Sequence, residues 1–255
     1  MFMDYKKFSR RVLCLALLMP VSTVAAELTV AVASNFTAPA NHLAEEFEAQ
    51  SEHQVRLVFG SSGRFFAQIS NGAPFDLFFS ADQEKPQELI ENGLAIDDSL
   101  FTYALGGLVL WSRDEQLIQS SPAVLSSNQF RRLSIANARH APYGIAAEEV
   151  LNNLNLLANL QSKLVRGENI AQTFQFVFTG NAELGFVAKS QVYQDDILIS
   201  GSAWQVTEDL YSPIRQDAVL LQRASTNDAA LAFLAFVRSS RGRSIIGSYG
   251  YVVGD

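Results

Sequence analysis

Apolar segments alternate along this chain with segments of helical periodicity. The Val-rich stretch at 28–34 predicts a buried strand, because it is short, apolar and bounded by polar residues. After it, apolar Leu43 and Phe47 and acidic Glu45 and Glu48 fall on different faces of a predicted helix. Further strands or extended segments are predicted at 54–60, 75–80, 106–112, 132–137, 162–167, 183–190 and 211–223. Further helices are predicted at 63–72, 81–93, 142–157, 168–182 and within 227–251.

This alternation predicts an α/β fold in which mostly parallel sheets are flanked by helices on both faces. The length that follows residue 26 suits two lobes better than one. We expect the chain to cross between the lobes near 103–107 and to return near 212–217. Lobe 1 would then comprise 27–104 plus 214–255, and lobe 2 would comprise 105–213.

The first 26 residues have the composition of a secretory signal peptide. Four basic residues between positions 6 and 11 precede an apolar run, and small residues at 24–26 precede an expected cleavage before Glu27. The run is too short, and too interrupted by Pro20, for a good membrane span. We therefore expect a secreted protein, with an uncleaved anchor as the alternative. The export route, Sec or twin-arginine, stays open.

Removal of this segment would leave an acidic chain without cysteine. The segment contains four basic residues and one acidic residue, so the formal net charge changes from −7 to −10. It also contains Cys14, the single cysteine of the sequence. Disulfides, thiol catalysis and cysteine-ligated zinc are thereby excluded from the mature part. An acidic surface also argues against nucleic acid as a partner, because phosphates require Lys and Arg.

Small residues, or positions with an accessible backbone amide, recur where a predicted strand gives way to a predicted helix. Ser34-Asn35 follow the first strand and Ser62 follows the second, while two later junctions contain Tyr143 and Ile170. In doubly wound folds the carboxyl ends of strands gather at one crevice, where helix N-termini offer unpaired N–H groups and partial positive charge. Ordinary helix capping explains any single junction as well. The pattern alone leaves capping and anion binding open.

Other kinds of site find little support in the sequence. The histidines His42, His53 and His140 lack metal-ligand spacing, and no glycine-rich nucleotide loop occurs. The Gly-Ser-Ser-Gly run that contains Ser62 lacks the spacing of a nucleophile elbow. Arg64, close to Ser62, is interpreted as a helix-surface residue. A secreted hydrolase with Ser62 as its nucleophile remains the alternative from another class of protein.

Five segments of the chain, taken together, are characteristic of one family. They are AVASNFTAPANHLAEEFE, FGSSGRFFAQISNGAPFDLFFSADQEKPQEL, FTYALGGLVLWS, APYGIAAEEVL and ELGFVAKSQV. In these segments the chain resembles the periplasmic molybdate-binding proteins of ABC transporters. The similarity extends from Glu27 to the C-terminal GYVV, and the combination of the Gly-Ser-Ser-Gly run with NGAPFDLFFSAD is its most specific part.

The resemblance implies a two-lobed solute-binding protein that closes on molybdate or tungstate and delivers it to a membrane permease. It implies a monomer with no enzymatic activity, no cofactor and no metal bound as a cation. Other members carry Tyr at the position of Ala188, so one hydroxyl donor is missing here, and Tyr143 is the candidate to supply it. The ligand contacts carried over by motif are Ser34, Asn35, Ser62, Tyr143 and, through its backbone N–H, Ile170.

Three alternatives stay open at this point, and the secreted hydrolase named above is one of them. A sulfate- or phosphate-binding protein of the same fold would use the same junctions. A protonated phosphate would need an acceptor, which the junctions lack, whereas sulfate differs from molybdate only in size. An anion sensor that docks on a receptor is the third alternative.

Overall fold

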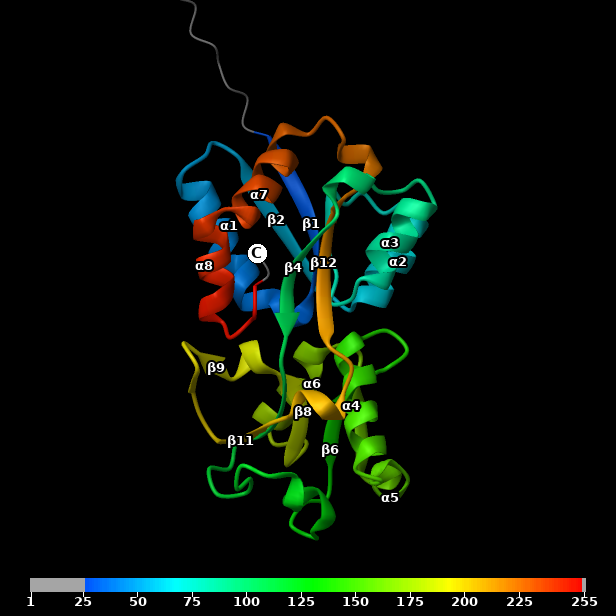
Figure 1. The fold of residues 1–255 in the computed structure, drawn as a ribbon, viewed down its shortest axis with the longest axis vertical. Helices are drawn as coiled ribbons and strands as arrows, with labels where there is room; N and C mark the ends of the chain where they lie inside the picture. Colours follow the sequence, from blue (N-terminus) through cyan, green and yellow to red (C-terminus); the bar gives the residue numbers. More distant parts are fainter. Residues whose placement is uncertain (1–25, 254–255) are drawn as a thin grey trace, which may run out of the picture.

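Two five-stranded sheets, one above the other, form the centres of the two lobes (Figure 1). The structure is a computed structural model that describes residues 26–253, so the expected signal peptide lies, except for Ala26, outside the described residues. The first sheet has the order β2 (Gln54–Gly60), β1 (Glu27–Ala33), β3 (Leu77–Phe79), β12 (Ile214–Leu220) and β4 (Phe101–Gly106). The second has the order β11 (Ser202–Gln205), β5 (Leu108–Ser112), β8 (Leu184–Ala188), β6 (Leu133–Ala136) and β7 (Leu164–Gly167). A separate short hairpin is formed by β9 (Tyr193–Gln194) and β10 (Ile197–Leu198).

Four strands of each sheet run in one direction and the fifth runs against them. β12 is antiparallel to both of its neighbours in the first sheet, and β5 is antiparallel to both of its neighbours in the second. The other pairs are parallel. The predicted α/β fold with two lobes and mostly parallel sheets is therefore confirmed. The chain crosses between the sheets twice, from β4 through Gly106 and Gly107 into β5, and from β11 into β12. The reversed strands, β5 and β12, are the first strands after these crossings.

Helices cover both faces of each sheet. On the first sheet, α1 (Thr37–Ala49), α7 (Asp228–Arg238) and α8 (Ser240–Ser248) pack on one face, and α2 (Ser62–Ser70) and α3 (Glu84–Glu91) pack on the other. On the second sheet, α4 (Pro142–Asn153) and α5 (Leu157–Leu160) cover one face and α6 (Ile170–Phe178) covers the other. Within residues 26–253, none of the helices has the length and apolar character needed to cross a bilayer.

The alternation of side chains along β1 explains how one strand serves two layers of helices. Val30 and Val32 belong to the cluster formed with α1 and α7, whereas Ala31 belongs to the cluster formed with α2 and α3. All three side chains are buried. The part of β1 from Val30 to Ala33 is thus continuously apolar, because both of its faces are covered, as in other parallel sheets.

Several predicted helices are shorter in the structure, each for a local reason. The helix predicted at 81–93 begins only at Glu84, because the Asp82 carboxylate accepts the Lys85 N–H at 3.0 Å and forms a turn before it. The closing helix splits at Ser239, whose hydroxyl accepts the Gly242 N–H at 3.1 Å and caps α8. The helix predicted at 142–157 ends at Asn153, and Asn155 follows with a φ of 57°.

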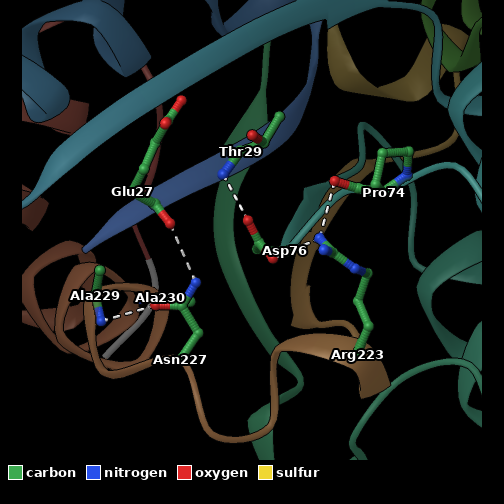
Figure 2. Close-up of polar contacts among 8 residues, drawn as sticks. All are labelled: Glu27, Thr29, Pro74, Asp76, Arg223, Asn227, Ala229 and Ala230. Atoms are coloured by element: carbon green, nitrogen blue, oxygen red, sulfur yellow. Dashed lines mark hydrogen bonds and ion pairs between the residues drawn. The ribbon is translucent and has the colours of Figure 1, made fainter.

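A buried carboxylate ties together three segments at the end of lobe 1 that is remote from lobe 2 (Figure 2). Asp76 accepts the Thr29 N–H of β1 at 2.7 Å and pairs with Arg223 Nη1 at 2.7 Å. Arg223 also donates to the Pro74 carbonyl at 2.9 Å. Nearby, Asn227 caps α7 and donates to the Glu27 carbonyl at 3.3 Å. These contacts fix the start of β1 against the segments before β3 and α7.

We expect Asp76→Ala to lower the free energy of unfolding by about 1–3 kcal/mol, because a buried backbone N–H loses its charged acceptor. Urea denaturation measures this change. The control is Glu46→Ala, which breaks the exposed Arg241–Glu46 pair and should cost less than about 1 kcal/mol. Equal effects of the two substitutions would contradict the role assigned to Asp76.

Candidate functional site

A small pocket lies where the ends of strands from both sheets meet the beginnings of four helices. Its cavity volume is about 10 Å³, roughly the room that one water molecule needs. The residues that line it are Ala33, Ser34, Asn35, Gly60, Ser61, Ser62, Ala81, Ala141, Pro142, Tyr143, Asn169 and Ile170. All five residues predicted from the sequence are among them, so residues from far-separated parts of the chain are brought to one place.

Backbone N–H groups at this pocket lack acceptors within their own helices. Ser62 and Ile170 are the first residues of α2 and α6, and Tyr143 follows Pro142 at the start of α4. The first N–H groups of a helix have no intrahelical partner, and they carry the positive end of the helix dipole. Ser61 precedes α2, Ala141 precedes α4, and Ala33 precedes a short 3₁₀ helix, Ser34–Phe36, that leads into α1. None of these three residues provides a side-chain cap. Three of the four junctions therefore keep donors that capping does not satisfy.

The two serines of the Gly-Ser-Ser-Gly run present hydroxyl groups in different ways. Ser62 Oγ accepts the Ala81 N–H at 2.9 Å, so its own hydrogen is free to be donated to a ligand. Ser61 Oγ is buried and has no hydrogen-bond partner within the described residues. A buried hydroxyl without a partner costs about 1–3 kcal/mol, and it calls for an explanation. Because Ser61 lines the pocket, an acceptor bound there would supply that partner.

The side chains of Asn35 and Tyr143 are engaged by the protein itself. The Asn35 amide nitrogen donates to Gln216 Oε1 at 2.7 Å and to the Tyr251 hydroxyl at 2.9 Å. The Tyr143 hydroxyl accepts from Gln216 Nε2 at 3.2 Å and interacts with the Tyr251 hydroxyl. Both amide hydrogens of Asn35 therefore have protein partners. What these two residues offer to a ligand is chiefly their backbone N–H.

These contacts belong to a buried polar network behind the pocket that joins the two lobes. Ser190, from lobe 2, donates to the Asn35 carbonyl at 2.8 Å, and the Tyr251 hydroxyl lies 3.0 Å from the Ser190 hydroxyl. Gln216 is fully buried, and its Oε1 accepts a hydrogen bond from the Tyr103 hydroxyl at 2.9 Å. Gln216, Tyr251 and Ser190 were not predicted from the sequence.

Burial keeps the phenols of this network protonated. It raises the pKa of Tyr251 to about 12, and it raises the pKa values of Tyr103 and Tyr143 well above that of a free tyrosine. The phenols therefore remain neutral hydrogen-bond donors at ordinary pH. They can hold the backbone around Asn35 without bringing a negative charge close to the pocket.

The pocket has no charged side chain among the described residues that line it. Within residues 26–253, no group of three or more His, Cys, Asp or Glu side chains is placed to hold a metal ion. The partner of Ser62 Oγ is a backbone N–H, rather than a histidine that could remove its proton. The arrangement is thus suited to holding a small anion by neutral donors, and it does not favour the hydrolase alternative.

Ala188 stands where the resemblance leads one to expect a tyrosine. It is fully buried at the end of β8, in the same apolar cluster as Tyr143, and it does not line the pocket. The Tyr143 hydroxyl lies in the polar network, close enough to Gly106 that a Cβ on Gly106 would overlap with it. Tyr143 therefore fills the space beside Gly106, at the end of β4. Any side chain larger than hydrogen at Gly106 would displace the Tyr143 hydroxyl.

We expect Tyr251→Phe to make stability less sensitive to alkaline pH. The pKa of Tyr251 is about 12 in the folded protein and about 10 in the unfolded chain. The contribution of this phenol to the free energy of unfolding is therefore complete below pH ~10 and is lost as the pH rises toward 12. This difference corresponds to about 2–3 kcal/mol. Urea denaturation between pH 8 and 11.5 should show a steeper loss for the wild-type protein than for the variant. Parallel pH profiles would contradict the assignment.

Comparison with known proteins identifies the family. The family described as bacterial extracellular solute-binding protein matches residues 28–252. The chain is 50% identical over 234 residues to the molybdate-binding protein ModA of Azotobacter vinelandii, which covers 92% of this chain and 93% of that protein. It is 45% identical over 240 residues to ModA of Rhodobacter capsulatus, with coverage of 93% and 94%. The solved periplasmic molybdate-binding protein of A. vinelandii has a TM-score of 0.87 at 39% identity, over 89% of this chain and 100% of that structure. The chain therefore belongs to the family of bacterial extracellular solute-binding proteins.

Proposed function

We propose that this protein captures molybdate in the pocket between its lobes and delivers it to an ABC permease. The observation that carries the proposal is a pocket lined by uncharged hydrogen-bond donors at the beginnings of four helices. Two of these donors are the hydroxyls of Ser61 and Ser62, whose hydrogens are available to a ligand. The relatives that match most of the chain are themselves named as molybdate-binding proteins. We infer a binding and transport role rather than catalysis.

The chemistry of a fully deprotonated oxyanion matches this set of donors. Such an anion presents only acceptors, so every group that faces it must donate. Each hydrogen bond to a charged group contributes about 1.5–3 kcal/mol, so a few of them offset the loss of the anion's hydration without any cationic side chain. The donors we propose are the hydroxyls of Ser34, Ser61 and Ser62 and the backbone N–H groups of Asn35, Tyr143 and Ile170.

Selectivity among anions would follow from protonation and from size. Phosphate that carries a proton would need an acceptor, and no Asp or Glu lines the pocket within the described residues. Leaving that proton unpaired costs about 1–3 kcal/mol. Sulfate has the charge and shape of molybdate but is smaller, so only the dimensions of the pocket can exclude it. Tungstate has the shape and charge of molybdate, and we propose that it binds as well.

We further propose how the lobes move and where the protein acts. Lobe 1, comprising 27–104 plus 214–255, and lobe 2, comprising 105–213, would rotate about the two crossings between the sheets and close on the anion. The protein would act as a monomer in the periplasm after removal of residues 1–26. Its contact with the permease would be transient.

A thermal-shift panel with molybdate, tungstate, sulfate and phosphate tests the proposal. An anion present at 100 times its dissociation constant adds about 2.7 kcal/mol to stability, so molybdate and tungstate should raise the melting temperature by several degrees. Phosphate should leave it unchanged. Ile170→Pro serves as the control, because it removes a backbone N–H at the pocket and should abolish the rise. A shift with phosphate but not with molybdate would contradict the proposal.

We expect Ser61→Ala and Ser62→Ala each to weaken molybdate binding by about 1–3 kcal/mol, since each removes one donor to a charged group. Isothermal titration calorimetry measures the effect. Ser134→Ala is the matched control: Ser134 Oγ is also buried without a partner in the described residues, but it lies in the core of lobe 2 and does not line the pocket. Equal losses in all three variants, or none, would contradict the roles of Ser61 and Ser62.

A further inference from the structure

An ion pair connects the two lobes beside the pocket. Arg64 lies in the first turn of α2, two residues after Ser62, and its guanidinium pairs with the carboxylate of Glu168. Glu168 belongs to the loop between β7 and α6 and lies two residues before Ile170. Each member of the pair is therefore next to a residue of the pocket, but on a different lobe. Arg64 is thus a half-exposed residue on the surface of α2 whose side chain also contacts lobe 2.

A backbone contact on the same side supports the arrangement. The Gly63 N–H donates to the His140 carbonyl at 2.9 Å, again from lobe 1 to lobe 2. A Cβ on Gly63 would lie 3.1 Å from His140 Cα, so any larger residue at this position would crowd the backbone of lobe 2. Two neighbouring residues of α2 thus both contact lobe 2, and both contacts would break if the lobes moved apart.

We propose that the Arg64–Glu168 pair is a latch that stabilises the closed arrangement of the lobes, with or without an anion, and so slows release of the bound anion. The proposal rests on the proposed function for its ligand, and it adds a residue pair that controls the lifetime of the complex. Arg64 and Glu168 do not line the pocket, so they act through lobe closure rather than by holding the anion. Because both side chains are about half exposed, the effect of the pair is modest and depends on salt.

The competing explanation is that the charge of Arg64 attracts the anion directly. The two explanations predict opposite effects of Glu168→Gln on binding. Neutralising Arg64 removes a positive charge near a dianion, and neutralising Glu168 removes a negative one. Simple attraction therefore predicts that Arg64→Gln weakens binding and that Glu168→Gln strengthens it. The latch predicts that both substitutions speed release, because each breaks the same pair.

The experiment measures the molybdate dissociation rate by stopped-flow fluorescence in the wild-type protein, both single variants and the double variant. Each single variant should release molybdate about two- to five-fold faster, and the double variant should be no faster than either. In 1 M salt, where the Debye length is about 3 Å, the differences should shrink. Opposite effects of the two single variants, or unchanged rates, would overturn the latch.

The matched control is the Arg241–Glu46 pair, which has similar exposure but lies entirely within lobe 1. Arg241→Gln and Glu46→Gln should leave the release rate unchanged. Small-angle X-ray scattering of the unliganded proteins gives a readout that does not need molybdate: the Arg64 and Glu168 variants should have a larger radius of gyration than the wild type. If the wild-type protein fails to bind molybdate, the proposed function fails, and the scattering data still decide on the latch.

Discussion

The site depends on one physical constraint, which is that the first N–H groups of a helix have no acceptor in the helix itself. At most helix beginnings a side chain or water satisfies them. At this pocket, the residues before α2 and α4 do not cap, and the buried Ser61 hydroxyl beside them has no hydrogen-bond partner within residues 26–253. The fold thus concentrates unsatisfied donors where the two lobes meet. An anion without protons would satisfy them together, and this requirement links the fold to the proposed function.

Holding these donors in place requires a rigid surrounding, which the buried polar network provides. Gln216 contacts Asn35, Tyr103 and Tyr143, and Tyr251 contacts Asn35 from the C-terminal segment. Every member of this set is buried. Polar networks of this kind favour one geometry, because any shift leaves a group unpaired in a medium of low polarity. The side chains of the network form hydrogen bonds within the protein and so position the backbone. The backbone N–H groups are then the groups that would contact a ligand.

Much of this could be predicted from the sequence, and the failures have physical causes. The alternation of strands and helices predicted the fold, and small residues at strand ends predicted which junctions meet in the pocket. The partners of Asn35 could not be predicted, because Gln216 and Tyr251 are distant in sequence and reach it only through the crossings between lobes. Ser61 was missed because a run of two serines does not reveal which hydroxyl finds a protein partner. The position of Arg64 opposite Glu168 depends on how the two lobes are placed, which local periodicity does not encode.

The reversed strand β12 has a consequence for the order in which the chain can fold. It lies between β3 and β4, although more than a hundred residues separate it from β4 in the sequence. During synthesis the ribosome delivers β1 to β4 long before β12, so the first sheet lacks the strand between β3 and β4 until β12 has been made. The second sheet, by contrast, comes from one continuous stretch, 108–205, and can assemble as soon as that stretch is available. We therefore expect the lobe that begins the polypeptide to be the one that is finished last.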